Sequence, residues 1–163
     1  MTTQPSSQPS QPGAVIVDAN VAVAISSKEA GRESLATTVL YKYAGQGYEW
    51  FAPGAIVTET LYALCQKRQA GLISATEHGD AVNSFEVLMG IIQSPPGGDA
   101  ALVRRAYEIC NNYGCSRSAD AVYIALAEEM DKTRPTVLLT FDQGVPKQAS
   151  KNALTVVVEV LTI

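Results

Sequence analysis

The sequence predicts an α/β fold with three layers, in which helices cover both faces of a central, mostly parallel sheet. Two observations lead to this prediction. Short apolar runs alternate with segments of helical periodicity, and these runs are apolar at every position, which is typical of strands buried on both faces. A chain of 163 residues, 47% hydrophobic and 17% charged, favours one globular domain over residues 14–163.

The N-terminal half is predicted to alternate strand and helix. The β-branched apolar run Ala14–Val17 indicates a buried strand, and Lys28–Ala44 has apolar residues four positions apart, as a helix requires. Glu49–Pro53 is predicted as a second short strand, followed by a helix over Pro53–Arg68. A further helix over Ser74–Met89 begins with a capping-box pattern.

The C-terminal half continues the alternation. Ile91–Gln93 is predicted as a brief strand, and after a Pro- and Gly-rich loop Asp99–Tyr113 is predicted as a helix. The segment Ser118–Met130 is apolar nearly all round, which indicates a buried helix. Thr136–Thr140 is a continuous apolar strand, and Leu154–Leu161 is predicted as the last strand.

Composition excludes several classes of protein. Residues 1–13 are rich in Ser, Gln and Pro and uncharged, so we expect a disordered tail and not a signal peptide. No apolar run is long enough to span a membrane, and the three cysteines show no CxxC pattern, which predicts reduced thiols in the cytoplasm. The net charge of −4 argues against a binder that relies on a broad basic surface.

Two acids directly follow predicted parallel strands. Asp18 follows Ala14–Val17, and Asp142 lies just beyond Thr136–Thr140. Ligands of such sheets bind beyond the carboxyl ends of the strands, and neighbouring strands are only about 4.7–4.9 Å apart. Two carboxylates so close resist joint ionisation unless a cation is present. Taken alone, Asp18 is equally explained as a cap of the turn after its strand.

Two further acids lie on predicted helices. Asp120 is in the first turn of an apolar helix for which Ser118 is the better N-cap candidate, so its carboxylate is free to point elsewhere. Glu59 falls opposite an expected apolar stripe of Val57, Leu61 and Leu64, where a solvated acid is the ordinary interpretation. Four acids without a neighbouring His or Cys suit Mg²⁺ or Mn²⁺, because these ions prefer oxygen ligands.

Four segments together resemble the PIN domain family, and more closely its VapC-type toxin ribonucleases. They are VIVDANV, PGAIVTETLYAL, SADAVYIALA and LLTFDQGV, in this order along the chain. The resemblance implies a metal-dependent ribonuclease that cleaves single-stranded RNA and leaves a 5′-phosphate and a 3′-hydroxyl. It implies a cognate antitoxin and a homodimer as partners. The family often has an aromatic residue three positions after its last Asp, where this chain has Val145.

The resemblance also assigns roles by position. Asp18, Glu59, Asp120 and Asp142 match the acidic metal-site residues, which are also the catalytic ones. Asn20 and Thr140 match polar residues that support these carboxylates, although a helix N-cap explains Asn20 equally well. The four segments contain no Lys or Arg. The nearest basic candidates for binding RNA phosphates are Arg104, Arg105 and Arg117.

Three alternatives remain open at this point. One is a catalytically silent interaction module with the same fold. A phosphoacceptor receiver domain needs an acid pair after the first strand, where Asp18 stands alone. A phosphatase of the haloacid-dehalogenase type needs Asp-x-Asp, and Asn20 replaces the second acid.

Overall fold

Four parallel strands form one sheet in the computed structural model, which describes residues 11–163. The strands lie in the order β2–β1–β3–β4, so the first strand is central. Their bounds are Ala14–Val17 for β1, Glu49–Phe51 for β2, Thr136–Thr140 for β3 and Val157–Val160 for β4. Residues 1–10 of the predicted disordered tail lie outside the described residues.

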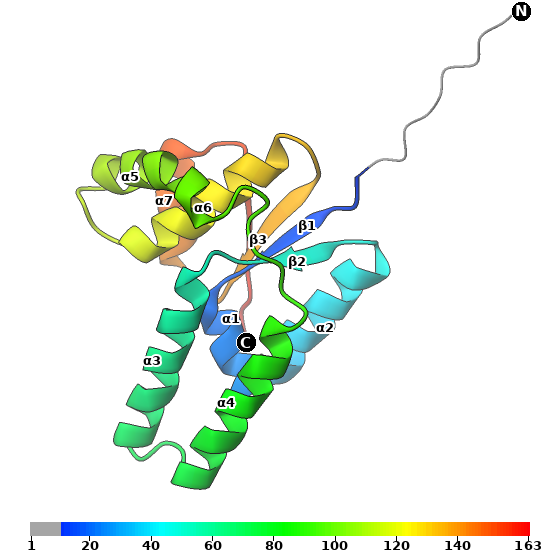
Figure 1. Cartoon of the computed structure of the whole chain (residues 1–163), viewed down its shortest axis with the longest axis vertical. Helices are drawn as coiled ribbons and strands as arrows, with labels where there is room; N and C mark the ends of the chain where they lie inside the picture. The colour runs from blue at the N-terminus through cyan, green and yellow to red at the C-terminus, as the bar shows by residue number, and fades with distance from the viewer. Residues whose placement is uncertain (1–10) are drawn as a thin grey trace, which may run out of the picture.

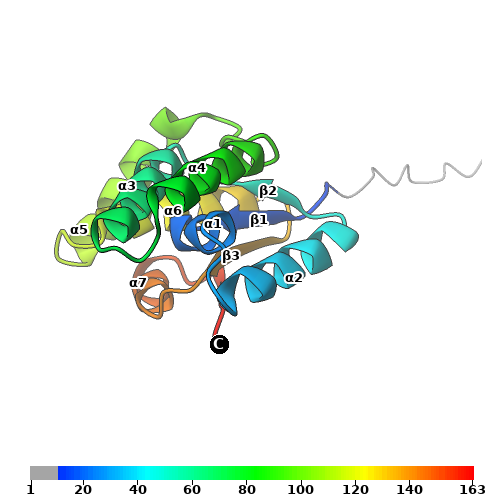
Figure 2. The same cartoon turned by 90° about the horizontal axis from the view of Figure 1, so that it is seen from below.

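Seven α-helices accompany the sheet within residues 11–163. In chain order these are α1 (Ala19–Ser26), α2 (Arg32–Gly45), α3 (Ala55–Gln69), α4 (Ala75–Met89), α5 (Val103–Asn112), α6 (Ser118–Asp131) and α7 (Gly144–Asn152). Helices flank the sheet on both sides, with α2 on one side and α3 and α4 on the other (Figure 2). In Figure 1, α3 and α4 extend together away from the sheet. No helix among the described residues combines the length and the apolar character that crossing a membrane requires.

The predicted fold class is confirmed, because every strand pair is parallel and helices cover both faces of the sheet. Strands β1 and β3 are buried at every position, as their continuous apolar sequences predict. Register places Ile16 between Phe51 of β2 and Leu138 of β3. The carboxyl ends of β1 and β3 therefore lie side by side, which sets the position of the residues that follow them.

Several element predictions are wrong in detail. Helix α1 had no predicted counterpart because its apolar, β-branched sequence does not show the periodicity of an amphipathic helix. Helix α7 was not predicted either, because it is short and contains Pro146. The first turn of a helix tolerates a proline. The brief strand at Ile91–Gln93 is only an isolated bridge between Phe51 and Gln93. The helix predicted from Asp99 starts as a 3₁₀ turn and becomes α-helical at Val103.

Candidate active site

A cavity of about 290 Å³ lies at the carboxyl ends of β1 and β3, and the four predicted acids line it. Asp18 directly follows β1, and Asp142 comes two positions after β3. Glu59 reaches the cavity from α3, and Asp120 from the first turn of α6. Residues up to 124 positions apart (142 − 18) are thus brought together. The other lining residues are Ala19, Asn20, Val23, Glu29, Arg32 and Ala63.

The Asp18 carboxylate is buried, with 5% of the residue exposed. Its Oδ2 accepts hydrogen bonds from Thr140 Oγ1 at 2.6 Å and from Asn20 Nδ2 at 2.8 Å. Burial raises the pKa of Asp18 to about 7, and the nearby charges of Asp120 and Glu59 add to the rise although the Thr140 hydroxyl opposes it. A carboxylate with neutral partners in such a place is stabilised by a cation.

Asn20 and Thr140 join the ends of β1 and β3. Asn20 Nδ2 also donates to Thr140 Oγ1 at 3.0 Å, and Asn20 Oδ1 accepts from the Phe141 N–H at 2.9 Å. Thr140 Oγ1 accepts from the Asp142 N–H at 2.9 Å. The alternative that Asn20 caps a helix is wrong, because α1 begins at Ala19 with Asp18 in the N-cap position. Both side chains orient the two aspartates.

Asp120 and Asp142 share one cation, the guanidinium of Arg117. Arg117 Nε donates to Asp120 Oδ2 at 2.5 Å, and Arg117 Nη2 donates to Asp142 Oδ2. Burial raises the pKa of Asp120 and outweighs Arg117. Burial acts in the same sense on Asp142, but the Gly144 N–H and Arg117 outweigh it, so the pKa of Asp142 is lowered. The expected N-cap role of Ser118 is wrong, because Arg117 holds that position in a left-handed backbone conformation.

Glu59 is half-buried and faces the cavity. Tyr123 on α6 donates its hydroxyl proton to Glu59 Oε2 at 2.9 Å. Burial raises the pKa of Glu59, the Tyr123 hydrogen bond opposes this, and the charge of Asp120 adds to it. The predicted apolar stripe is wrong, because Val57 and Leu61 are exposed. The buried positions of α3 are Ile56, Thr60 and Leu64.

The basic residues differ from the sequence-based expectation. Arg105 lies outside the cavity and donates to Glu128 Oε1 at 2.8 Å and to the Asn152 carbonyl at 2.6 Å, so it connects α5, α6 and the end of α7. Arg104 is exposed on α5 beside Glu108 and does not line the cavity either. For Arg104 and Arg105, this placement does not favour the predicted contact with RNA at the acids.

Two residues around the start of α2, one in the preceding loop and one at the first helical position, were missed by the sequence analysis. Glu29 and Arg32 line the cavity, and the Arg32 guanidinium lies 4.9 Å from the centre of the Phe141 ring. Glu29 accepts ion pairs from Arg32 at 3.3 Å and from Lys67 at 2.7 Å. No spacing rule links these residues to the acids, because the loop reaches the cavity only through the packing of α1 against α2 and α3.

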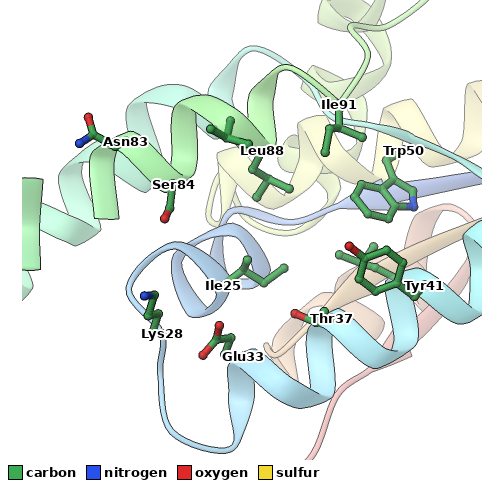
Figure 3. Close-up of a pocket in the computed structure, with 12 residues that line it drawn as sticks. Ile25, Lys28, Glu33, Thr37, Tyr41, Trp50, Asn83, Ser84, Leu88 and Ile91 are labelled. Carbon is green, nitrogen blue, oxygen red and sulfur yellow. The ribbon is translucent and has the colours of Figure 1, made fainter. Parts of the chain in front are cut away.

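A second cavity, an apolar groove of about 430 Å³, lies between α2 and α4 and contains none of the four acids. Tyr41 and Trp50 form one end of it, and Lys28 and Glu33 lie at the other (Figure 3). The rings of Tyr41 and Trp50 pack edge to face, with centroids 6.4 Å apart. Val87 on the rim is largely exposed. The groove therefore joins an apolar aromatic end to a charged end.

The donor set in the acidic cavity fits a hard divalent cation. It offers carboxylate oxygens, and the buried Asp18 carboxylate has only neutral hydrogen-bond donors. As the side chains are placed, no three His, Cys, Asp or Glu residues within 11–163 lie close enough together to hold one metal ion. Arg117 stands between Asp120 and Asp142.

A parallel α/β domain with carboxylates gathered beyond its strand ends is typical of hydrolytic sites that use divalent cations. The PIN domain family model matches residues 15–151, and the chain belongs to this family. PIN domains are generally nucleases that depend on divalent metals.

The fold comparison agrees with this family. A chain from the crystal structure of VapBC2 from Rickettsia felis, bound to a DNA fragment from their promoter, superposes with a TM-score of 0.62. The match covers 90% of this chain and 98% of that chain, at 10% sequence identity. The similarity concerns the fold. No curated protein matches the chain.

Proposed function

We propose that residues 14–163 form one nuclease domain that hydrolyses phosphodiester bonds of single-stranded RNA, with Mg²⁺ or Mn²⁺, as the cytoplasmic toxin of a toxin–antitoxin pair. The observation that carries the proposal is the cavity lined by Asp18, Glu59, Asp120 and Asp142 in a chain of the PIN family. Its carboxylates leave phosphate neutralisation to a cation, in agreement with the net charge of −4.

In this proposal Asp18, Asp120 and Asp142 hold the divalent ion, and Glu59 either completes that set or holds a second ion. When bound, the ion would lower the pKa of a water and stabilise the charge that develops on the scissile phosphate. Asn20 and Thr140 fix the two strand-end aspartates relative to each other. Tyr123 holds Glu59 toward the cavity in the same manner.

Cleavage of a mixed pool of single-stranded RNA tests the activity. We expect wild-type protein to cleave with Mn²⁺ and to stop after chelation, and Asp18→Asn to cleave at least about a hundredfold more slowly. Asp18→Asn keeps an oxygen that accepts from Thr140 and Asn20, because both bonds go to the same atom. Cleavage that survives exhaustive chelation would exclude the metal mechanism, and undiminished cleavage by Asp18→Asn would place the site elsewhere.

We further propose a homodimer and a cognate antitoxin that inserts an apolar segment into the groove between α2 and α4. Two observations support the antitoxin: the structural neighbour from Rickettsia felis is a toxin–antitoxin complex, and the groove combines a Tyr41–Trp50 wall with exposed Val87. Such apolar patches commonly mark protein interfaces.

Co-expression with the protein encoded by the neighbouring open reading frame tests this partner, and sedimentation tests the homodimer. We expect the pair to co-purify and the Val87→Asp variant to lose the partner, since a charge in an apolar groove is costly to desolvate. Because Val87 is exposed, its substitution is expected to leave the melting temperature unchanged. Retention of the partner by Val87→Asp would contradict the groove assignment.

A further inference from the structure

The Arg117 side chain occupies the space between two of the proposed metal ligands. Its Nε donates to Asp120 at 2.5 Å and its Nη2 to Asp142, so one guanidinium neutralises both carboxylates. The other two acids have neutral partners: Thr140 and Asn20 donate to Asp18, and Tyr123 donates to Glu59. Within residues 11–163, Arg117 is therefore the only basic side chain bonded to any of the four acids. It bonds the two acids, Asp120 and Asp142, that a divalent ion would also need.

The fold provides a place for this guanidinium. A Cβ on Gly144 would lie 2.5 Å from Arg117 Cζ, which is far inside van der Waals contact, so a side chain there would require the guanidinium to move away. The Arg117 backbone is left-handed, with φ 54° and ψ 48°, a conformation that non-glycine residues rarely adopt. The fully buried Gln148 side chain donates to the Arg117 carbonyl at 3.4 Å. The Gln148 bond holds the Arg117 backbone, and the ion pairs with Asp120 and Asp142 hold its side chain.

We propose that Arg117 is an internal counter-cation that competes with the divalent ion, so that the ion enters only when the guanidinium withdraws from between Asp120 and Asp142. This inference rests on the proposed metal site and adds its regulation. Withdrawal is sterically open, because about a third of the Arg117 side chain is exposed to solvent. In this arrangement Asp120 and Asp142 stay paired with Arg117 while the protein is metal-free. The concentration of the divalent ion then determines the fraction of molecules whose site holds metal.

Competition reduces the apparent affinity in proportion to the fraction of molecules whose guanidinium is withdrawn. If about one molecule in ten is open, removing the competitor tightens apparent Mn²⁺ binding about tenfold. Two variants remove it in different ways. Arg117→Gln deletes the positive charge, whereas Gly144→Ala keeps the charge and places a methyl group where the guanidinium lies. Gly144 has an ordinary backbone conformation, and alanine retains the N–H that bonds Asp142.

The experiment measures Mn²⁺ dissociation constants by calorimetry on the folded full-length chain, with chelator-treated protein at the start. We expect both Arg117→Gln and Gly144→Ala to bind Mn²⁺ about tenfold more tightly than wild type. This factor follows from an open fraction of about one molecule in ten. Arg104→Gln makes the same charge change on an exposed side chain outside the cavity and should match wild type. In chelator, Arg117→Gln should melt at a lower temperature and gain more from Mn²⁺ than wild type, because Asp120 and Asp142 lose their partner.

The outcomes separate this inference from the proposed metal site. If wild type binds Mn²⁺ and neither variant binds it more tightly, the competition is refuted while the metal site stands. If only Arg117→Gln gains affinity, the gain reflects net charge and the competition is again refuted. If no protein binds Mn²⁺, the metal site fails and the inference with it. Should Arg117→Gln not fold, Gly144→Ala alone decides.

Discussion

A carboxylate buried as deeply as Asp18 loses hydration that neutral hydrogen-bond donors do not replace. Its pKa in the folded protein is about 7, against an ordinary value of 3.8, so the folded state binds this proton more tightly than the unfolded chain does. The stabilisation is therefore complete below the ordinary pKa and is lost as the pH rises through about 7. A bound divalent ion would remove this penalty.

Asp18→Asn is predicted to remove the contribution of Asp18 to this pH dependence. In chelator, the wild-type free energy of unfolding should fall between the two pKa values, and that of the variant should fall by less, because only the raised pKa values of Glu59 and Asp120 remain. At a pH well above 7 the variant should be more stable by about 3–5 kcal/mol, since the pKa of Asp18 rises from 3.8 to about 7 and one pKa unit corresponds to about 1.4 kcal/mol. Urea titrations at several pH values measure this. A variant as pH-dependent as wild type would show that another group is responsible.

The Tyr123 hydroxyl is predicted to hold Glu59 in its charged, cavity-facing state. Tyr123→Phe removes the 2.9 Å hydrogen bond and should destabilise the protein by about 1 kcal/mol near neutral pH. It should also weaken Mn²⁺ binding, because the pKa of Glu59 rises further when its donor is lost. Tyr107→Phe, on an exposed ring, is the control. Equal Mn²⁺ affinities for both variants would contradict a positioning role for Tyr123.

At the residue scale, the sequence predicted the strand-end acids better than the helical ones. Asp18 and Asp142 follow apolar strands, and parallel topology places strand ends together. Periodicity placed Glu59 on the solvent side because it took the apolar residues of α3 as the buried face. The buried face instead includes the polar residue Thr60, next to Glu59. The ion pair of Arg117 with Asp142, 25 positions away, depends on how α6 and α7 pack, which no local pattern reveals.

At the scale of elements, Arg105 holds α5, α6 and α7 together. Arg105→Ala is predicted to lower the free energy of unfolding by about 1–3 kcal/mol, because Glu128 and the Asn152 carbonyl lose charge-assisted bonds. Cleavage of RNA per folded molecule should be unchanged. Chemical denaturation together with cleavage assays measures both, with exposed Arg104→Ala expected to change stability by less than about 0.5 kcal/mol. A loss of RNA affinity with intact stability would instead support the sequence-based prediction that Arg105 contacts RNA.

Helix prediction succeeded for the longer segments α2 to α6 and missed the two short helices α1 and α7. The capping box of α4 is formed as predicted, with Ser74 and Glu77 exchanging side chain to backbone bonds. Helix α1 is buried almost throughout, so it lacks the polar face from which periodicity is recognised. Helix α7 begins at Gly144, which lies against the Arg117 guanidinium. This contact depends on tertiary packing and leaves no local sequence pattern.

At the scale of the whole molecule, the parallel three-layer fold was predictable because both faces of β1 and β3 are covered, which makes their sequences apolar at every position. The distribution of charge was less accessible from sequence. Three described basic residues bond acids that line the cavity: Arg32 and Lys67 both bond Glu29, and Arg117 bonds two of the four predicted acids.

This charge distribution predicts that cleavage depends steeply on the divalent ion and only weakly on monovalent salt. Each phosphate of a single strand neutralised by Lys or Arg contributes about −0.7 to the slope of log affinity against log salt. With Arg32, Lys67 and Arg117 all paired to acids of the cavity, we expect a slope for kcat/KM no steeper than about −2 at saturating Mn²⁺. Glu29→Gln releases Arg32 and Lys67 from their shared partner, so its slope should become steeper by about one unit. A wild-type slope steeper than about −4 would mean that RNA is held by a basic surface outside this cavity. A Glu29→Gln slope equal to that of wild type would mean that Arg32 and Lys67 do not face the substrate.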